Sequence, residues 1–348
     1  MIQAYRRIFS CILVINFVMA GITRGQADGG DTVKLKPSGR PIALFFLNYG
    51  AGLGNANNNS GFNLTRAYLG YGFRISETLS ARAVIDVAEA ANGSDRAVGF
   101  KFATVKWEYR NLTVDFGLTG LVQFELQEKF WGYRYIAMSY QDLYKMGPSA
   151  DLGIVTSYKF TDWIEADISI TNGEGHRKLN RNNSNKYAAG MTLNIQDKFL
   201  FRLYGDIYND SPDLHPVLPD GDTASYNDQH TISLFGGYRH PFFSIGAEYN
   251  YQGNKGFIED RREYGYSVYS TIKAWEKLHF FCRYDHLASK LPGGISGDWD
   301  DEQTRNLGIA GLEYHPVKQL KFAPNYQFVK LQNNSALHYI YINVEFRW

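Results

Sequence analysis

The chain has 348 residues and a formal net charge of +1, so its composition does not suggest a strongly charged partner such as nucleic acid. Aromatic residues make up 16% of the chain, yet its mean hydropathy is −0.34. After residue 22 no segment approaches the roughly 18 apolar residues of a membrane-spanning helix, which excludes a helical membrane protein.

The first residues have the pattern of an export signal. Two arginines precede an apolar stretch, residues 9–22, that is too short to span a bilayer. Small residues that suit a cleavage site end at Ala20 and at Ala27. We therefore predict a signal peptide over residues 1–27 and a mature domain over residues 28–348, which keeps one cysteine and so has no internal disulfide.

Beyond residue 40, candidate β-strands alternate with connections that are short and long in turn. Seven short connections fall at residues 76–78, 110–111, 161–162, 196–197, 240–241, 276–277 and 317–318. Eight long ones, rich in Gly, Asn and Asp, fall at residues 54–61, 89–96, 123–149, 173–185, 209–228, 253–262, 289–304 and 332–336. This rhythm predicts an all-β fold, a transmembrane antiparallel β-barrel of about sixteen strands, because such barrels place tight turns at one end and longer loops at the other. The alternative fold, a secreted β-sandwich, does not require this alternation of short and long connections.

The end of the chain has the pattern of a closing barrel strand. Residues 337–348 alternate large apolar residues with polar ones, so that Ile342 falls on one face and Asn343 on the other. One face suits lipid and the other suits water. We expect this strand to pair with the first strand, near residues 43–49, and so to remove the free edges of the sheet.

The same period of two places charged residues opposite the apolar face in several other strands. A polar interior in a barrel of sixteen strands implies a water-filled channel unless loops fill it. Basic and acidic residues on this face are nearly matched in number, whereas an anion-selective pore needs an uncompensated positive field. The residues that we expect to line the pore are Arg66, Arg82, Asp86, Lys106, Arg202, Asp206, Arg283 and Asp285.

The longest connection, residues 123–149, is rich in aromatic side chains, which are poorly suited to a loop that extends into solvent. We expect this long third extracellular loop to fold into the lumen as a constriction, where its charged side chains set the local field. The alternatives are an outer lid and a loop that packs in a subunit interface. The constriction residues that we predict are Glu125, Glu128, Lys129, Arg134, Asp142 and Lys145.

Three short motifs point to a family. Residues 62–72 read FNLTRAYLGYG, residues 151–154 read DLGI, and residues 170–175 read ITNGEG. The first resembles the early hairpin of the phosphate-selective porin O and P family of Gram-negative bacteria. The other two resemble the strand start and the corner that follow the constriction loop in that family. The resemblance covers roughly residues 60–175. It implies a sixteen-stranded channel, usually trimeric, with an inward loop after the fifth strand.

Two departures from the family favour a general or weakly selective porin over a phosphate-specific one. After the fifth strand the family continues with a Gly, a basic residue and a Pro-Phe pair, whereas residues 117–124 read GLTGLVQF. The clustered basic residues that select phosphate in the family are also not matched here, because the inward charges of the two signs are similar in number.

Catalytic and metal-binding patterns are weak. Asp285 and His286 are adjacent on a strand, so they point to opposite faces and cannot form a simple catalytic dyad. His176 and two other histidines fall in or beside loops, where we expect solvated side chains. The acidic run at residues 298–302 lacks the spacing of an EF-hand calcium loop. We therefore predict no enzyme activity, no metal site and no cofactor.

The sequence favours a porin in the outer membrane of a Gram-negative bacterium, through which small hydrophilic solutes diffuse passively. Its expected partners are small solutes or anions, outer-membrane lipid and further copies of the chain in a homotrimer. The alternatives are an anion- or phosphate-selective porin, a barrel enzyme, and a ligand-binding or adhesive surface barrel.

Overall fold

The computed structural model describes residues 38–56, 60–89, 96–178, 183–218, 222–292, 304–332 and 334–348. The predicted signal peptide and the acidic run at residues 298–302 lie outside these ranges, so the expectations about both stay predictions.

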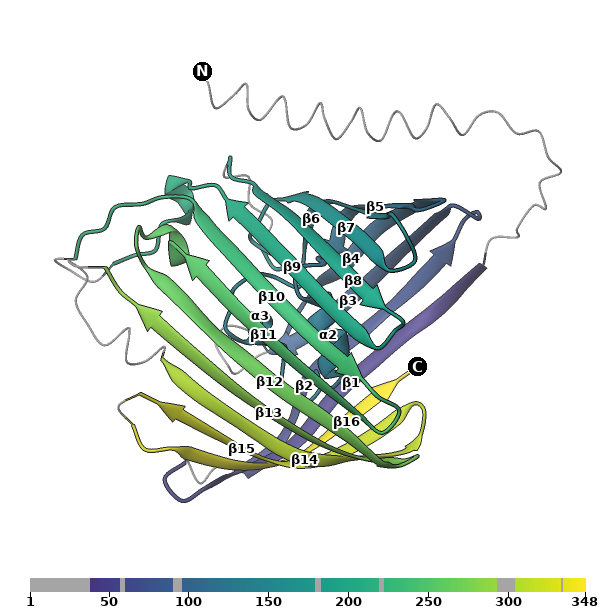
Figure 1. Ribbon diagram of the computed structural model, residues 1–348, viewed down its shortest axis with the longest axis vertical. Coiled ribbons are helices and arrows are strands. Elements are labelled where there is room, and N and C mark those ends of the chain that lie inside the picture. Colours follow the sequence, from purple (N-terminus) through teal and green to yellow (C-terminus); the bar gives the residue numbers. More distant parts are fainter. Residues whose placement is uncertain are drawn as a thin grey trace. The chain divides into compact units, whose positions relative to one another are not determined.

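Sixteen strands form one closed antiparallel barrel, in which each strand pairs with its neighbours along the chain (Figure 1). The strands are β1 (Ser38–Leu53), β2 (Ser60–Arg74), β3 (Leu79–Glu89), β4 (Arg96–Tyr109), β5 (Leu112–Gly120), β6 (Ala150–Lys159), β7 (Ile164–Thr171), β8 (Lys186–Ile195), β9 (Phe199–Tyr208), β10 (Gln229–Arg239), β11 (Phe243–Gly253), β12 (Arg262–Trp275), β13 (Leu278–Lys290), β14 (Arg305–Val317), β15 (Leu320–Leu331) and β16 (Leu337–Arg347). The helices are α2 (Glu125–Trp131), α3 (Tyr140–Leu143), η1 (Pro212–Leu214) and η2 (Lys255–Phe257). Within the described ranges, no helix is long and apolar enough to cross a membrane.

The sixteen-stranded barrel predicted from the sequence is confirmed. Each predicted connection joins two strands at, or within a few residues of, its expected place. The seven short connections lie at one end of the barrel, called here the short-turn end, and the eight long ones lie at the other, the long-loop end. Both ends of the barrel sheet, at Ser38 and Arg347, lie at the short-turn end.

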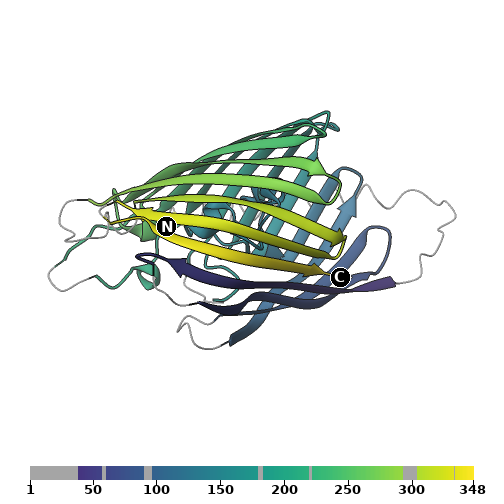
Figure 2. The same ribbon diagram turned by 90° about the horizontal axis from the view of Figure 1, so that it is seen from below.

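The first and last strands close the barrel as expected. Tyr49 of β1 lies opposite Ile342 of β16, and the Trp348 N–H donates a hydrogen bond of 2.9 Å to the Ala43 carbonyl. Figure 2 shows the two strands side by side, β1 in purple and β16 in yellow. Closure leaves no unpaired sheet edge, which would otherwise invite pairing with another chain.

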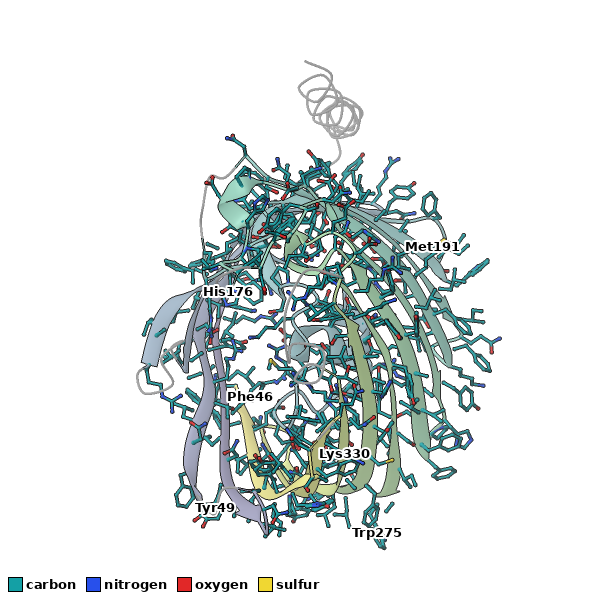
Figure 3. The ribbon with its side chains drawn as sticks, turned by 90° about the vertical axis from the view of Figure 1, so that its left-hand side faces the viewer. Phe46, Tyr49, His176, Met191, Trp275 and Lys330 are labelled. Atoms are coloured by element: carbon teal, nitrogen blue, oxygen red, sulfur yellow. The ribbon has the colours of Figure 1, made fainter. Side chains whose placement is uncertain are left out.

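The two faces of the strands differ as the period of two requires. On β9, Phe201 and Leu203 point outward with 44% and 48% of their surface exposed, whereas Arg202 and Tyr204 point inward with 4% and 3% exposed. Figure 3 shows the same division, with Phe46 among the interior side chains and Met191 on the outer surface. The apolar outer face and the polar inner face are those of a barrel built for lipid outside and water inside.

Candidate functional site: a constricted lumen

The connection between β5 and β6, residues 121–149, lies inside the barrel, where α2 and α3 are seen behind the strands (Figure 1). α2 has Glu125 and Glu128 in its first turn, where the helix dipole favours negative charge. It ends at Trp131 and is capped by Gly132, whose φ of 75° is in the left-handed region that glycine adopts easily. The expected inward fold of this segment, called here the inner loop, is confirmed.

Aromatic side chains attach the inner loop to one side of the barrel. The ring of Phe130 lies 5.3 Å from that of Phe235 on β10, and the ring of Trp131 lies 5.5 Å from that of Tyr269 on β12. Phe130 and Trp131 are 7% and 2% exposed. Burial of a side chain such as Phe130 contributes about 1.5–3 kcal/mol, so these contacts hold the loop firmly against the wall.

Two glycines on the wall make room for Phe130. Gly237 on β10 and Gly246 on β11 are register partners, and both lie under the Phe130 ring. A Cβ atom would lie 2.6 Å from the ring at Gly237 and 2.9 Å from it at Gly246, which is closer than atoms pack. The absence of side chains at these two positions therefore sets how near the loop approaches the wall.

Hydrogen bonds fix the middle of the inner loop. The Tyr135 hydroxyl donates to a Glu313 carboxylate oxygen at 2.7 Å, and the Asn343 amide donates to the Tyr135 carbonyl at 3.0 Å. The Arg283 guanidinium donates to the Met138 carbonyl at 2.6 Å. Because these groups are buried, an unmade bond would leave each partner unsatisfied at a cost of about 1–3 kcal/mol.

The end of the inner loop is held in the same way. The Gln141 amide donates to the Ser233 hydroxyl at 3.0 Å, and the Gln252 amide donates to the Met146 carbonyl at 2.7 Å. All four residues in these two hydrogen bonds are at most 1% exposed. The inner loop is thus attached to the barrel wall at its end as well as in its middle.

Three ion pairs lie on the inner wall beneath the inner loop, and all six side chains in them are 5% exposed or less. The pairs are Arg202–Asp167 at 2.7 Å, Lys186–Asp206 at 2.8 Å and Arg283–Asp285 at 2.6 Å. Four of these residues, Arg202, Asp206, Arg283 and Asp285, were expected from the sequence to line the pore. They face inward as expected, but they are covered, so their carboxylates and guanidinium groups balance buried charge instead of facing an open lumen.

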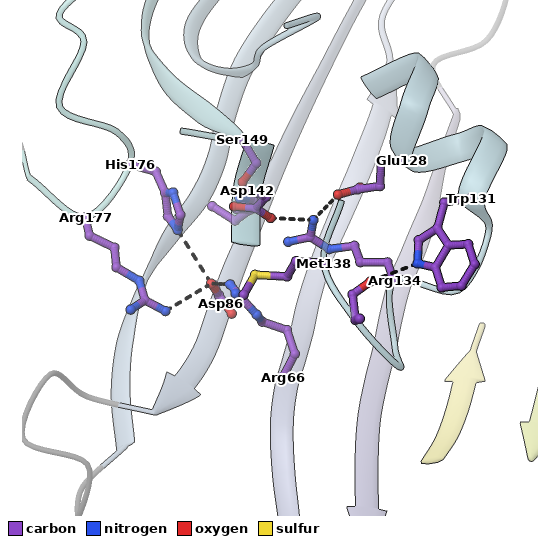
Figure 4. A network of polar contacts seen from close by, with 12 residues as sticks. Arg66, Asp86, Glu128, Trp131, Arg134, Met138, Asp142, Ser149, His176 and Arg177 are labelled. Atoms are coloured by element: carbon purple, nitrogen blue, oxygen red, sulfur yellow. Dashed lines mark hydrogen bonds and ion pairs between the residues drawn. The ribbon is translucent and has the colours of Figure 1, made fainter. Parts of the chain in front are cut away.

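The opposite side of the lumen carries a second charged cluster (Figure 4). Arg66 on β2 contacts the Asp86 carboxylate of β3 at 2.6 Å, and the His176 and Arg177 side chains approach the same carboxylate at 3.5 Å and 3.9 Å. Lys101, at 3% exposed, contacts the Ser149 hydroxyl between this cluster and the inner loop. Arg66 and Asp86 were predicted to line the pore, whereas Lys101 was not selected.

His176 is not the solvated loop residue that the sequence suggested. The Asp151 carboxylate accepts hydrogen bonds from the N–H groups of Gly173 and Gly175, both of which have positive φ. Asp151 at the start of β6 therefore contacts the corner at residues 170–175. This turn directs His176 toward Asp86. Burial lowers the pKa of the His176 imidazole below its ordinary value, although the nearby Asp86 carboxylate opposes the shift.

The inner loop presents its own charges across from that cluster (Figure 4). Arg134 contacts the carboxylates of Glu128 and Asp142, the latter at 2.9 Å, and the three side chains are 15–24% exposed. Burial raises the pKa of the Glu128 carboxyl above its ordinary value, while Arg134 lowers it. The loop therefore offers a basic group that two acidic groups already compensate.

A cavity of about 530 Å³ opens at the short-turn end along β1 to β5. Its charged lining residues are Arg40, Arg74, Glu77, Arg82, Lys106, Glu108 and Asp115. Lys106 lies 3.9 Å from both Glu108 and Asp115, and the Arg82 guanidinium lies 3.8 Å from the centre of the Phe102 ring. Arg82 and Lys106, both predicted to line the pore, are thus placed on an open part of the wall.

A second cavity, of about 350 Å³, lies between the inner loop and β1, β2, β14 and β15. Its basic lining residues are Arg66, Arg134 and Arg305, and the rest of its lining is mostly apolar. The most exposed charged pair of the loop is Glu125–Lys129, at 2.5 Å, with side chains 49% and 68% exposed. Lys145, also predicted as a constriction residue, is exposed, and its carbonyl accepts a hydrogen bond from Lys255.

The catalytic alternative gains no support from this arrangement. Asp285 is bound by Arg283 and by the Ser267 hydroxyl, and it is fully buried. His286 is on the opposite face of β13, where its ring contacts Asn306.

Neither a protein-family model nor a curated protein matches this sequence. Solved structures do. The outer membrane channel DcaP of Acinetobacter baumannii is 11% identical, with a TM-score of 0.65, and the match covers 92% of this chain and 99% of that one. A trimer form of OmpT, an outer membrane protein of Vibrio cholerae, is 11% identical, with a TM-score of 0.62, and the match covers 90% and 99%. An anion-selective porin from Comamonas acidovorans is 12% identical, with a TM-score of 0.63, and the match covers 90% and 100%.

The chain has a porin-like barrel fold. At 11–12% identity these similarities concern the fold alone, and they extend over nearly the whole length of both chains. They agree with the sixteen closed strands and the helical segment after β5.

A methyl group at Gly237 should disturb the docking of the inner loop. We expect Gly237→Ala to lower the free energy of unfolding by about 1–3 kcal/mol, because the new Cβ overlaps the Phe130 ring. Gly236→Ala is the matched control, since its Cβ would face outward and lie 3.6 Å from Phe201, an ordinary contact. Urea unfolding of the folded barrel measures both, and equal values for the two variants would contradict this account of the loop contact.

His176 should make stability depend on pH. Because burial lowers its pKa in the folded state, the unfolded chain binds a proton more readily, so stability should fall as the pH drops below about 6.5. The variant His176→Asn should lose this part of the dependence, whereas His240→Asn, in the short turn after β10, should keep it. Urea unfolding at pH 5.5 and 7.5 tests this, and an identical pH dependence of His176→Asn and the wild type would refute it.

Proposed function

We propose that the protein is an outer-membrane porin of a Gram-negative bacterium, through which small hydrophilic solutes diffuse passively. The observation that carries the proposal is a closed barrel of sixteen strands whose inner loop is fixed to one side of the interior. The solved structures with this fold include proteins titled as an outer membrane channel and a porin. The apolar outer surface and the predicted signal peptide support the same location.

The path for solutes follows the wall that the inner loop leaves uncovered. Arg82 and Lys106 lie on this wall at the short-turn end, in the cavity of about 530 Å³. Arg66 and Arg134 lie farther along the barrel, in the second cavity. Passage depends on the width that the loop leaves and on charges held on both sides of the path.

Weak ion selectivity follows from the pairing of most of the charges along this path. Arg66 is paired with Asp86, Arg134 with two carboxylates, and Lys129 with Glu125. A phosphate-selective pore, which the family resemblance suggests, needs basic groups without such compensation. The paired charges therefore favour a general porin over the phosphate-selective alternative.

We also propose a homotrimer. Support comes from the similar OmpT structure, which is titled as a trimer form. Outward-facing apolar side chains such as Leu234 and Ile207, at 51% and 53% exposed, suit either lipid or a neighbouring copy.

Planar-bilayer recordings test the proposed function. The folded protein should give stepwise ion currents without strong preference for anions. An absence of current would contradict the porin proposal. If phosphate at low concentration blocked the chloride current, the phosphate-selective alternative would replace it.

The exposed pair of the inner loop should tune this selectivity. Glu125→Gln leaves Lys129 uncompensated and should shift the reversal potential in a KCl gradient toward anion preference, while Lys129→Gln should shift it toward cation preference. Lys198→Gln is the control, because Lys198 is exposed in a short turn outside the lumen path. Shifts of the same size in all three variants would exclude a role for the pair.

A further inference from the structure

Two histidines and a glutamate meet on the inner wall near the short-turn end. His279 on β13 and Glu313 on β14 are register partners, and His315 follows on the same face of β14. The side chains of His279 and His315 are 19% and 24% exposed, whereas that of Glu313 is 5% exposed. The group is therefore accessible to a small ion from the lumen side while its carboxylate is held inside the wall.

The three donor atoms have the spacing of metal ligands. The Nδ1 atoms of His279 and His315 each lie 3.6 Å from the same carboxylate oxygen, Oε1 of Glu313. All the donor atoms lie within 4.8 Å of one another. Ligand atoms about 2.0–2.1 Å from a tetrahedral Zn²⁺ lie about 3.3–3.5 Å apart, so the two nitrogen–oxygen distances are already close to this spacing, whereas the largest separation in the group would have to shorten to hold such an ion.

The hydrogen bonding of His315 assigns its protons. Its Nε2 lies 2.8 Å from the Glu276 carbonyl oxygen, which can only accept, so Nε2 carries the hydrogen. In the neutral ring Nδ1 is then a lone-pair acceptor that faces the Glu313 carboxylate. This Nδ1 is buried and makes no hydrogen bond with any described residue. A ring nitrogen that faces a carboxylate without a hydrogen bond suits a bound cation, and a backbone carbonyl on the other ring nitrogen is the usual support of a metal-binding histidine.

The second oxygen of Glu313 is already occupied. Oε2 accepts the hydrogen bond from Tyr135 at 2.7 Å and lies 3.5 Å from the Lys321 ammonium, which is also 3.5 Å from Glu345. Oε1 is thus left to the two imidazoles. Because Tyr135 belongs to the inner loop, the Glu313 carboxylate connects the two histidines to that loop.

We propose that His279, Glu313 and His315 bind a divalent transition metal ion. Two imidazole nitrogens and one carboxylate oxygen suit Zn²⁺ and its neighbours, whereas Ca²⁺ and Mg²⁺ prefer oxygen ligands alone. Three protein ligands leave a fourth position for water or a solute group. The ion adds positive charge at the short-turn mouth and fixes the carboxylate that holds Tyr135.

Zinc binding to the full-length protein, folded in detergent and stripped with a chelator, tests the proposal. Equilibrium dialysis against Zn²⁺ should give one ion per chain for the wild type. His279→Ala and His315→Ala should each weaken binding by at least about tenfold. His240→Ala, which removes a histidine from another short turn at the same end, should bind as the wild type does.

Circular dichroism of each variant shows that loss of binding does not reflect loss of the barrel. Should an alanine variant fail to fold, Glu313→Gln provides a second test, because its amide oxygen still accepts from Tyr135 while the anionic ligand is lost. Absence of stoichiometric Zn²⁺ in the wild type, as expected if a proton lies between the acceptors, overturns the proposal. Equal binding by His315→Ala and the wild type overturns it too.

Discussion

A closed sheet of sixteen strands encloses more space than the side chains of its own wall can fill, and the inner loop fills part of this space. Phe130 and Trp131 provide the apolar contact with the wall, and hydrogen bonds such as Tyr135 to Glu313 fix the position of the loop along it. Without this attachment the ion pairs on β9 and β13 would lie in water, and the lumen would have no fixed width.

The attachment divides the interior into two sides with different chemistry. On the covered side, charges such as Arg202 and Asp167 neutralise each other away from water, where an unpaired charge would be strongly destabilising. On the uncovered side, Arg66 and Arg82 remain near the cavities. The position of the loop, more than the number of charged residues on the strands, decides which of these charges remain exposed to the lumen.

Much of the fold could be predicted from the sequence, because a strand repeats every two residues and outer-membrane barrels alternate short turns with long loops. The closure of β1 on β16 and the inward loop followed from these local patterns. The burial of Arg283 and Asp285 beside the inner loop did not, because it depends on where a loop more than a hundred residues away docks. His176 was misjudged for a similar reason, since Asp86 reaches it from a distant strand.

The histidine group shows the same limit. Glu313 and His315 are two residues apart and therefore share a face, which the sequence reveals. His279 joins them only through the register of β13 and β14, which no local pattern gives. Likewise, Gly237 and Gly246 are unremarkable in their own strands, and their role is evident only with Phe130 above them.

The docked inner loop sets the width of the lumen. Single-channel conductance of a variant that lacks residues 125–146, with a short Gly-Ser link between the paired strands β5 and β6, tests it most directly. We expect a several-fold larger conductance than that of the wild type in the same salt. An unchanged conductance would show that the constriction lies elsewhere and would contradict the account.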